Sequence, residues 1–177
     1  MTGTTLHIPT LETERLILRG PRRRDVDGFV EFFASDRAKY AGGSADTSKA
    51  WSEFAEMIGH WTLRGFGSYI ITRKYSDRGI GHVGGLHPPN WPEREIGWSL
   101  WRAHDEGRGY ATEAASAVIR HVYETLGWAT AVSYIAPDNV ASIAMAERLG
   151  ATRDKSARTP TGLRCFVYRH PAPEALH

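Results

Sequence analysis

The sequence has a single cysteine, no long apolar run and little net charge, and each of these scarcities excludes a class of protein. Cys165 has no second cysteine to pair with, so an internal disulfide is excluded. No Cys/His spacing resembles a zinc site, and no metal is predicted. No apolar stretch reaches the length of a signal sequence or of a membrane span. Together these features predict a protein of the reducing cytoplasm that does not bind membranes.

The charge is nearly balanced, with 22 lysines and arginines against 20 aspartates and glutamates. This balance does not indicate a specific nucleic-acid partner. The basic cluster Arg22–Arg24 is open to two interpretations, a contact with RNA or an acidic partner and a solvated surface, of which the second is the more common. With 177 residues, 41% of them hydrophobic, the chain is predicted to form a single domain over residues 1–177.

Apolar periodicity predicts alternating strands and helices. Helix N-caps are expected at Asp25 for the first helix, at Asp46 or Thr47 for the second, and at Asp138 or Asn139 for the last. The expected strands are "ERLILR", "GSYIITRK", "GIGHVGGLH", "EREIGWSLW", "ATAVSYIA" and "LRCFVYRH", with a short strand at 151–155.

The order of these segments indicates the topology. A helix connects "EREIGWSLW" to "ATAVSYIA", so these two strands should be parallel neighbours, whereas the earlier strands follow one another through short turns and should be antiparallel. We therefore predict an α+β fold, with one mixed and mostly antiparallel sheet and helices on both faces.

The segment "HDEGRGYATEAASAVI", residues 104–119, places two glycines directly before a helical pattern. The first backbone amides of a helix lack partners, and glycine lets an anion approach them, so this loop favours a phosphate site. A tight turn without a ligand is the alternative. The segment lacks the lysine and hydroxyl of a P-loop and the third glycine of a dinucleotide loop, where Thr112 stands instead. ATP and NAD are therefore poor candidates.

Two motifs resemble those of the GCN5-related N-acetyltransferases, or GNAT family, and within it the ribosomal-protein alanine N-acetyltransferase branch. They are "EGRGYATEA", following "REIGWSLW", and "NVASIAMAERLGA". The family motif Gln/Arg-x-x-Gly-x-Gly/Ala falls on residues 106–111, with Glu106 departing from its first position. The resemblance runs from "LETERLILR" to the last strand. It implies the GNAT fold, in which the two parallel strands splay apart, and acetyl-CoA as cosubstrate.

The resemblance also implies which residues hold acetyl-CoA. Main-chain amides of the glycine loop would cradle the diphosphate, the strand before it would hold the pantetheine arm, and Asn139 and Ser142 would bind that arm at the next helix. Asn139 has a structural alternative as an N-cap, and Ser142 as a small packed residue. The residues implied are Trp98, Ser99, Leu100, Glu106, Gly107, Arg108, Gly109, Tyr110, Ala111, Thr112, Asn139, Ser142 and Arg148.

Acetyl transfer needs a neutral amine, donors for the oxyanion and a proton for the leaving thiolate. Glu95 is the candidate base, since the strand period places it opposite the apolar Ile96; the alternative is a carboxylate that points into water. The tyrosine acid of many family members is replaced by Ala146, which leaves Ser142 or a water, with Tyr134 in reserve. Direct transfer is simpler than a covalent acetyl-enzyme.

The acceptor is predicted to be a primary amine, and the resemblance is strongest to enzymes that act on protein N-termini. Tyr40 and Trp91 are the candidate substrate-binding residues. Trp91, on the proline-stiffened loop "HPPNWPE", would form a wall of the acceptor pocket, with packing on the sheet as its alternative. Two alternatives stay open: a small-molecule acetyltransferase for a polyamine, amino acid or antibiotic, and a non-catalytic acyl-CoA-binding module. The expected oligomeric state is a homodimer.

Overall fold

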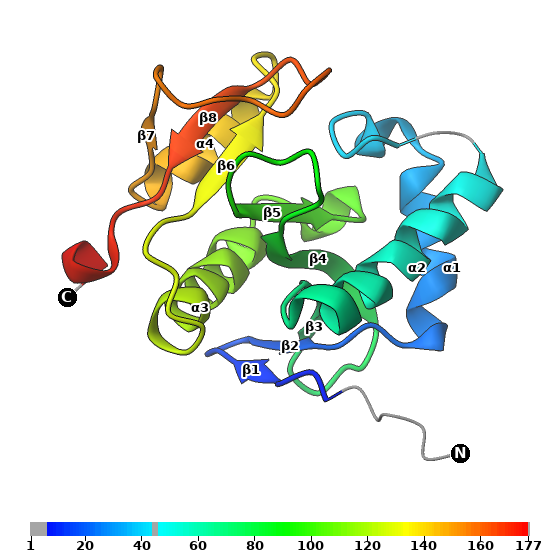
Figure 1. Cartoon of the computed structure of the whole chain (residues 1–177). Coiled ribbons are helices and arrows are strands. Elements are labelled where there is room, and N and C mark those ends of the chain that lie inside the picture. Colours follow the sequence, from blue (N-terminus) through cyan, green and yellow to red (C-terminus); the bar gives the residue numbers. More distant parts are fainter. Residues whose placement is uncertain (1–6, 44–45, 177) are drawn as a thin grey trace.

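The computed structural model of the protein describes residues 7–43 and 46–176, and its centre is one eight-stranded sheet (Figure 1). The strands lie in the order β1-β2-β3-β4-β5-β6-β8-β7, and only β5 and β6 are parallel. The strands are β1 (Leu11–Glu12), β2 (Leu16–Arg19), β3 (Ser68–Arg73), β4 (Gly79–Leu86), β5 (Glu95–Leu100), β6 (Val132–Ile135), β7 (Thr152–Arg153) and β8 (Phe166–Arg169). The predicted mixed, mostly antiparallel sheet is confirmed.

Helices cover both faces of this sheet (Figure 1). They are α1 (Val26–Phe33), α2 (Thr47–Arg64), α3 (Tyr110–Glu124) and α4 (Val140–Arg148), with short 3-10 turns at Arg23–Asp25, Asp36–Ala38, Ala103–Asp105 and Pro173–Leu176. The predicted order of elements is confirmed; β1, a two-residue strand, has no counterpart in the prediction. No helix in the described part of the chain is long and apolar enough to span a membrane.

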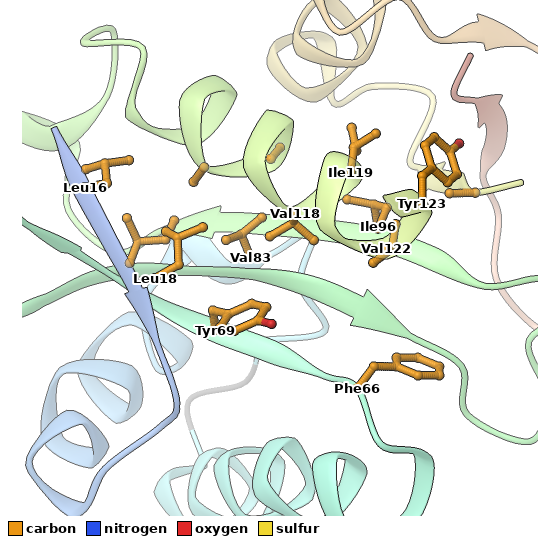
Figure 2. Packing of buried hydrophobic residues seen from close by; sticks show 14 of the residues in the cluster. Leu16, Leu18, Phe66, Tyr69, Val83, Ile96, Val118, Ile119, Val122 and Tyr123 are labelled. Atoms are coloured by element: carbon orange, nitrogen blue, oxygen red, sulfur yellow. The ribbon is translucent and has the colours of Figure 1, made fainter. Parts of the chain in front are cut away.

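The core is divided by the sheet. On one face the small and branched side chains of α3 let the helix pack closely on the central strands, and Figure 2 shows Leu18 and Val83 facing Val118. On the other face α1 and α2 enclose an aromatic layer in which Phe29 stacks on Phe33 with ring centroids 5.5 Å apart. Close packing on both faces holds the strands in place, and it thereby fixes the side chains and loops at the strand ends.

Two of the predicted helix N-caps differ in what their side chains bind. Asp46 is the N-cap of α2 as predicted, and its carboxylate accepts a hydrogen bond from the Ser48 amide at 2.8 Å. Asp25 is the N-cap residue of α1, as predicted, but its side chain accepts no bond from the first amides of that helix. A 3-10 turn precedes α1, and the Asp25 carboxylate binds the buried guanidinium of Arg19 instead, at 2.8 and 2.9 Å.

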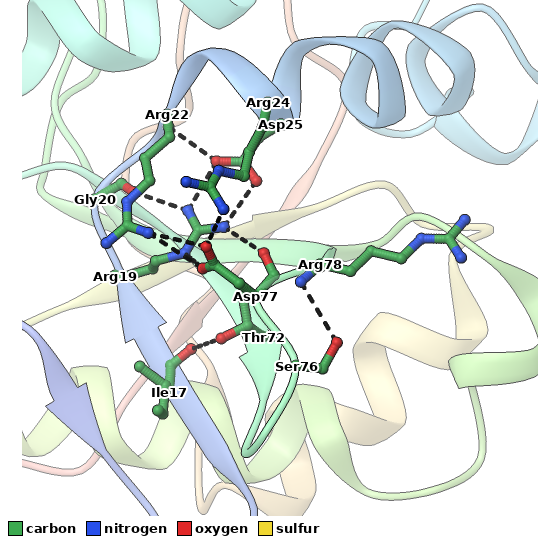
Figure 3. A network of polar contacts seen from close by, with 10 residues as sticks. All are labelled: Ile17, Arg19, Gly20, Arg22, Arg24, Asp25, Thr72, Ser76, Asp77 and Arg78. Atoms are coloured by element: carbon green, nitrogen blue, oxygen red, sulfur yellow. Dashed lines mark hydrogen bonds and ion pairs between the residues drawn. The ribbon is translucent and has the colours of Figure 1, made fainter.

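This Arg19–Asp25 pair is the centre of a polar network at the end of β2 (Figure 3). The two side chains are 4% and 1% exposed. Arg19 also donates to Asp77 in the β3–β4 turn, and the same carboxylate accepts bonds from Arg22 and Arg24. The network therefore ties the start of α1 to the neighbouring hairpin, and two of the three arginines of Arg22–Arg24 have a structural role.

Replacing Asp25 by asparagine is expected to lower the free energy of unfolding by about 3–5 kcal/mol, because Arg19 would keep a buried charge without its bidentate partner. Chemical denaturation measures this loss. Asp27→Asn is the matched control, since Asp27 is exposed on the same helix; its effect should stay within about 0.5 kcal/mol, apart from a small helix-dipole contribution. Equal stability of the two variants would contradict this account.

Candidate functional site

The site is built around the pair of parallel strands β5 and β6, which touch at one end only. Their register contains a single pair, Glu95 with Val132, and the Val132 amide donates to the Arg94 carbonyl at 3.1 Å. Beyond this pair, β5 stays bonded to β4 as far as Leu100, while β6 stays bonded to β8. The two strands therefore diverge, and the expected gap between them is present.

The free edge of β5 faces this gap. The Trp101 amide donates to Ile80 of β4 at 2.9 Å, so residues of the same parity bond to β4 and those of the other parity turn their amides toward β6. Trp98 and Leu100 belong to the second set, and Ser99 to the first. An extended chain entering the gap would therefore meet the backbone of Trp98 and Leu100, and Ser99 only through its side chain.

The glycine loop ends in an uncapped helix. Gly107 and Gly109 have φ values of +70° and +78°, a left-handed conformation that favours glycine. Gly109 is the N-cap of α3 and no side chain caps the helix, whose first internal bond runs from the Glu113 amide to the Gly109 carbonyl at 3.0 Å. The amides before Glu113 have no intrahelical acceptor, and they lie at the positive end of the helix dipole, which is the arrangement predicted for a phosphate site.

Two arginines from distant parts of the chain border this loop. Arg15 donates to the Arg108 carbonyl at 2.9 Å and lies over the Tyr110 ring, with its guanidinium carbon 4.9 Å from the centroid. Arg37 pairs with Glu106 at 2.5 Å. Glu106, the residue that departs from the family motif, is thus balanced by the positive charge of Arg37, which lies outside the motif.

Arg37 also fastens the end of β5, because its guanidinium donates to the Leu100 and Trp101 carbonyls, each at 3.2 Å. Sequence reasoning missed Arg15 and Arg37. Neither stands in a recognisable motif, and their contacts with the loop span 93 and 69 residues, so no local pattern could have found them.

Glu95 is buried, with 9% of its surface exposed, on the face of β5 opposite to Ile96. The Trp91 indole donates to its Oε2 at 2.5 Å. Burial raises the pKa of Glu95 to about 7, while the hydrogen bonds from Trp91 and from the Tyr134 amide act in the opposite direction. Gly97 beside it leaves room, since a Cβ there would lie 3.9 Å from the carboxylate. Glu95 thus does not point into bulk water.

Other groups near Glu95 keep their protons at neutral pH. Burial raises the pKa of Tyr134 to about 12, and its hydroxyl accepts a bond from the Glu93 amide at 3.2 Å. Burial, together with the charge of Glu95, raises the pKa of the Cys165 thiol. Trp91, predicted as a wall of the acceptor pocket, packs edge-on against Tyr134, with ring centroids 6.1 Å apart. Its indole also donates a hydrogen bond to the Glu95 carboxylate, a role that the sequence did not reveal.

Substituting Trp91 by phenylalanine is expected to raise the pKa of Glu95 above about 7, because the indole bond that stabilises the charged carboxylate would be lost. The rise of kcat/KM with pH, which follows deprotonation of Glu95, should then occur at a higher pH. Trp51→Phe is the control, since Trp51 is an exposed indole on α2. An unchanged midpoint would show that the indole does not influence the group that titrates.

The start of α4 lies beyond β6. Asn139 is the N-cap of α4 and accepts a hydrogen bond from the Ser142 amide at 3.2 Å, so its structural role is present, while its side-chain nitrogen makes no hydrogen bond within the described residues. The Ser142 hydroxyl likewise has no partner there and is half-buried. Tyr40 donates to the Asp138 backbone and carboxylate, both at 3.1 Å, and so bridges the α1–α2 loop to this helix start.

Two further predicted positions lie along α4. Ala146 is fully buried and packs with Ile135 and Tyr168, so core packing occupies the place of the family's tyrosine acid. Arg148 is exposed in the last turn, at the opposite end of α4 from Asn139, and its role toward a phosphate stays a prediction. Among residues 7–43 and 46–176, no three His, Cys, Asp or Glu side chains gather in a metal-binding arrangement.

Distant solved structures share this fold and differ in what they act on. RimL, described as a ribosomal L7/L12 α-N-protein acetyltransferase in complex with coenzyme A, is 19% identical, with 92% of this chain and 96% of that one covered and a TM-score of 0.69. AAC(6')-Ib, in complex with paromomycin and acetyl-CoA, is 18% identical with the same coverage and a TM-score of 0.76. At these identities the likeness shows the fold alone.

Nearer relatives show the family. An acetyltransferase from Agrobacterium tumefaciens is 39% identical, with 97% and 99% of the two chains covered and a TM-score of 0.87. An uncharacterized N-acetyltransferase, p20, from Bacillus licheniformis is 29% identical over 150 residues, covering 82% of this chain and 83% of p20. The acetyltransferase (GNAT) domain matches residues 15–152. The chain therefore belongs to the GNAT family of acetyltransferases and is an N-acetyltransferase.

Proposed function

We propose that the protein transfers the acetyl group of acetyl-CoA by direct attack to the α-amine of a protein N-terminus. The observation that carries this proposal is the buried carboxylate of Glu95, with its pKa of about 7, at the closed end of the β5–β6 gap. The proposal is supported by β5, which runs from Glu95 to Leu100, and by Arg37, which joins the Leu100 carbonyl to Glu106 of the glycine loop. The proposed base and the proposed cofactor site thus lie along one strand.

Acetyl-CoA would occupy the gap and the glycine loop. The amides of Gly107–Thr112 hold the diphosphate, and the Arg108 guanidinium adds positive charge. Arg15 and Arg37 are paired with Glu113 and Glu106, and they hold the loop in place. The pantetheine arm adds to the free edge of β5 at Trp98 and Leu100, with Asn139 and Ser142 on its other side.

In the reaction, the Glu95 carboxylate takes a proton from the ammonium group of the acceptor, directly or through a water. The neutral amine forms a bond to the thioester carbon while the carbon–sulfur bond breaks. The Trp98 amide donates to the oxygen that becomes negative. The attacking nitrogen then loses its second proton, which passes through the Ser142 hydroxyl or a water to the departing thiolate, so that the products are the amide and the CoA thiol. The CoA thiolate is a fair leaving group near neutral pH, which fits the alanine at position 146.

The pKa of the base favours an α-amine. A protein α-amine has a pKa of about 8, so moving its proton to a carboxylate of pKa about 7 costs roughly 1.4 kcal/mol. A lysine-like amine, with a pKa of about 10.4, raises that cost to roughly 4.6 kcal/mol. The tuning of Glu95 is therefore matched to a protein N-terminus and poorly matched to an alkyl amine such as a polyamine.

The test compares acceptors at pH 7 by the release of CoA thiol and by product mass. The acceptors are a peptide with a free N-terminal alanine, a lysine peptide whose α-amine is blocked, spermidine and paromomycin. We expect kcat/KM to be at least about tenfold higher for the free α-amine. Turnover of spermidine or paromomycin alone would assign a small-molecule acceptor. Binding of acetyl-CoA without turnover of any acceptor would assign a binding module.

A further inference from the structure

Two buried polar side chains at the closed end of the gap take no part in the proposed chemistry. Ser133 on β6 is 2% exposed, and His170, which follows β8, is 3% exposed. They lie on the face of the sheet opposite to Glu95, where the His170 ring meets the Trp98 ring edge-on at 6.4 Å. Burying the polar atoms of a serine and a histidine costs free energy unless those atoms are hydrogen-bonded.

The hydrogen bonds of this pair have a defined direction. The Ser133 hydroxyl lies 2.6 Å from the Ile96 carbonyl oxygen and 2.9 Å from Nε2 of His170. The carbonyl can only accept, so the single hydroxyl proton points to Ile96, and Nε2 must donate to the serine oxygen. His170 is then the neutral Nε2–H tautomer, and its buried Nδ1 is without a partner in the described structure. Burial agrees with this state, because it lowers the pKa of His170 to about 4.

The Ser133 bond stands where a backbone bond of the parallel ladder would be. The Val132 amide donates to the Arg94 carbonyl, so a continuing ladder would next join the Tyr134 amide to the Ile96 carbonyl. Neither group makes that bond: Ser133 takes the carbonyl, and the Tyr134 amide stabilises the charged form of the Glu95 carboxylate. One ladder bond is thus replaced by a side-chain bond to Ser133 on one face of the sheet and by an electrostatic contact with Glu95 on the other.

We propose that Ser133, oriented by His170, is a positioning residue that keeps β5 and β6 apart by taking the Ile96 carbonyl from the Tyr134 amide, which leaves that amide for Glu95. The inference rests on the proposed function, since it assigns the gap to acetyl-CoA and the base to Glu95. Ser133 makes no contact with the Glu95 side chain, and it acts on the gap and on the base through the two strands.

Removing the Ser133 hydroxyl should let the ladder close by one more bond. The gap would narrow at Trp98, and acetyl-CoA would bind more weakly. The Tyr134 amide would leave Glu95, and the pKa of the carboxylate would rise because that bond favours its charged form. The other titratable groups facing Glu95 are Tyr134 from β6 and Cys165 before β8, which both stay neutral in this range, so they do not mask the change.

The experiment uses Ser133→Ala, with Ser133→Thr as the control that keeps a hydroxyl on a strand-favouring side chain. For Ser133→Ala we expect acetyl-CoA affinity, measured by calorimetry, to fall about tenfold, as for the loss of one buried hydrogen bond. The midpoint of the kcat/KM profile should move to higher pH. Ser133→Thr should restore both quantities. His170→Phe, compared with His170→Gln, which keeps a donor, gives the same test where an alanine variant does not fold.

The outcomes separate this inference from the proposed function. A wild-type protein that does not bind acetyl-CoA overturns the proposed function, and the inference with it. A wild-type protein that binds and turns over, together with a Ser133→Ala variant of unchanged affinity and unchanged pH midpoint, overturns the inference alone. A variant that only melts at a lower temperature, with the same affinity and midpoint, also overturns it, because the pair would then be purely structural.

Discussion

Glu95→Gln is expected to lower kcat/KM by roughly 10²- to 10⁴-fold, the range that general acid–base catalysis contributes. Glutamine keeps the size of the side chain and can still accept a bond from the Trp91 indole, but it cannot accept the proton of the acceptor amine. The affinity for acetyl-CoA should be unchanged, because Glu95 lies on the face of the sheet away from Trp98. Calorimetry and steady-state kinetics on the same preparation separate the two quantities.

The pH dependence gives this prediction a second readout. The carboxylate works as a base only when deprotonated, so kcat/KM of the wild-type protein should rise as the pH rises through about 7. This limb should vanish in the variant and leave only the titration of the acceptor amine. Glu56→Gln is the control, since Glu56 is exposed on α2. A kcat/KM of Glu95→Gln within threefold of the wild-type value corresponds to a barrier change of at most roughly 0.7 kcal/mol. That result would mean that the neutral fraction of the amine reacts without a base.

The features that the sequence predicted are those with a local signal. The glycine loop before α3 is recognisable because a positive φ, a helix start and an anion site all favour glycine within a few residues. The strand pattern placed Glu95 and Ile96 on opposite faces of β5, because side chains alternate in any strand. The parallel pairing of β5 and β6 followed from the helix between them.

The features that the sequence did not predict depend on contacts between distant side chains. Arg37 balances Glu106 across 69 residues, and the Ser133 hydroxyl bridges to Ile96 across 37. Asp25 is of a residue type that favours N-caps, yet its carboxylate binds the buried guanidinium of Arg19 and not the helix amides. In each case a contact with a distant part of the chain, and not the local sequence, decides how the side chain is used.

Gly109→Trp is expected to abolish measurable acetyl-CoA binding. Gly109 is the N-cap of α3 with φ of +78°, and an added Cβ would lie 3.3 Å from the Arg15 guanidinium. A tryptophan at this position would project from the start of the helix, where the amides of the loop would hold the diphosphate, and would displace Arg15 from the loop. Loss of a diphosphate held by several charge-assisted bonds should weaken binding by at least about 100-fold.

The control for Gly109→Trp must carry the same backbone strain without blocking the site. Gly127, after the other end of α3, has φ of +65°, and nothing lies within 4 Å of a Cβ there. Gly127→Trp should therefore cost a similar amount of stability and leave the affinity for acetyl-CoA unchanged. Calorimetric titration of both variants and the wild type, with ATP and NAD as competing nucleotides, decides between the two interpretations of the loop. Loss of binding in Gly109→Trp alone makes it the diphosphate site; equal binding in all three proteins makes it a turn, and acetyl-CoA would then have to be held by the edge of β5 and the start of α4.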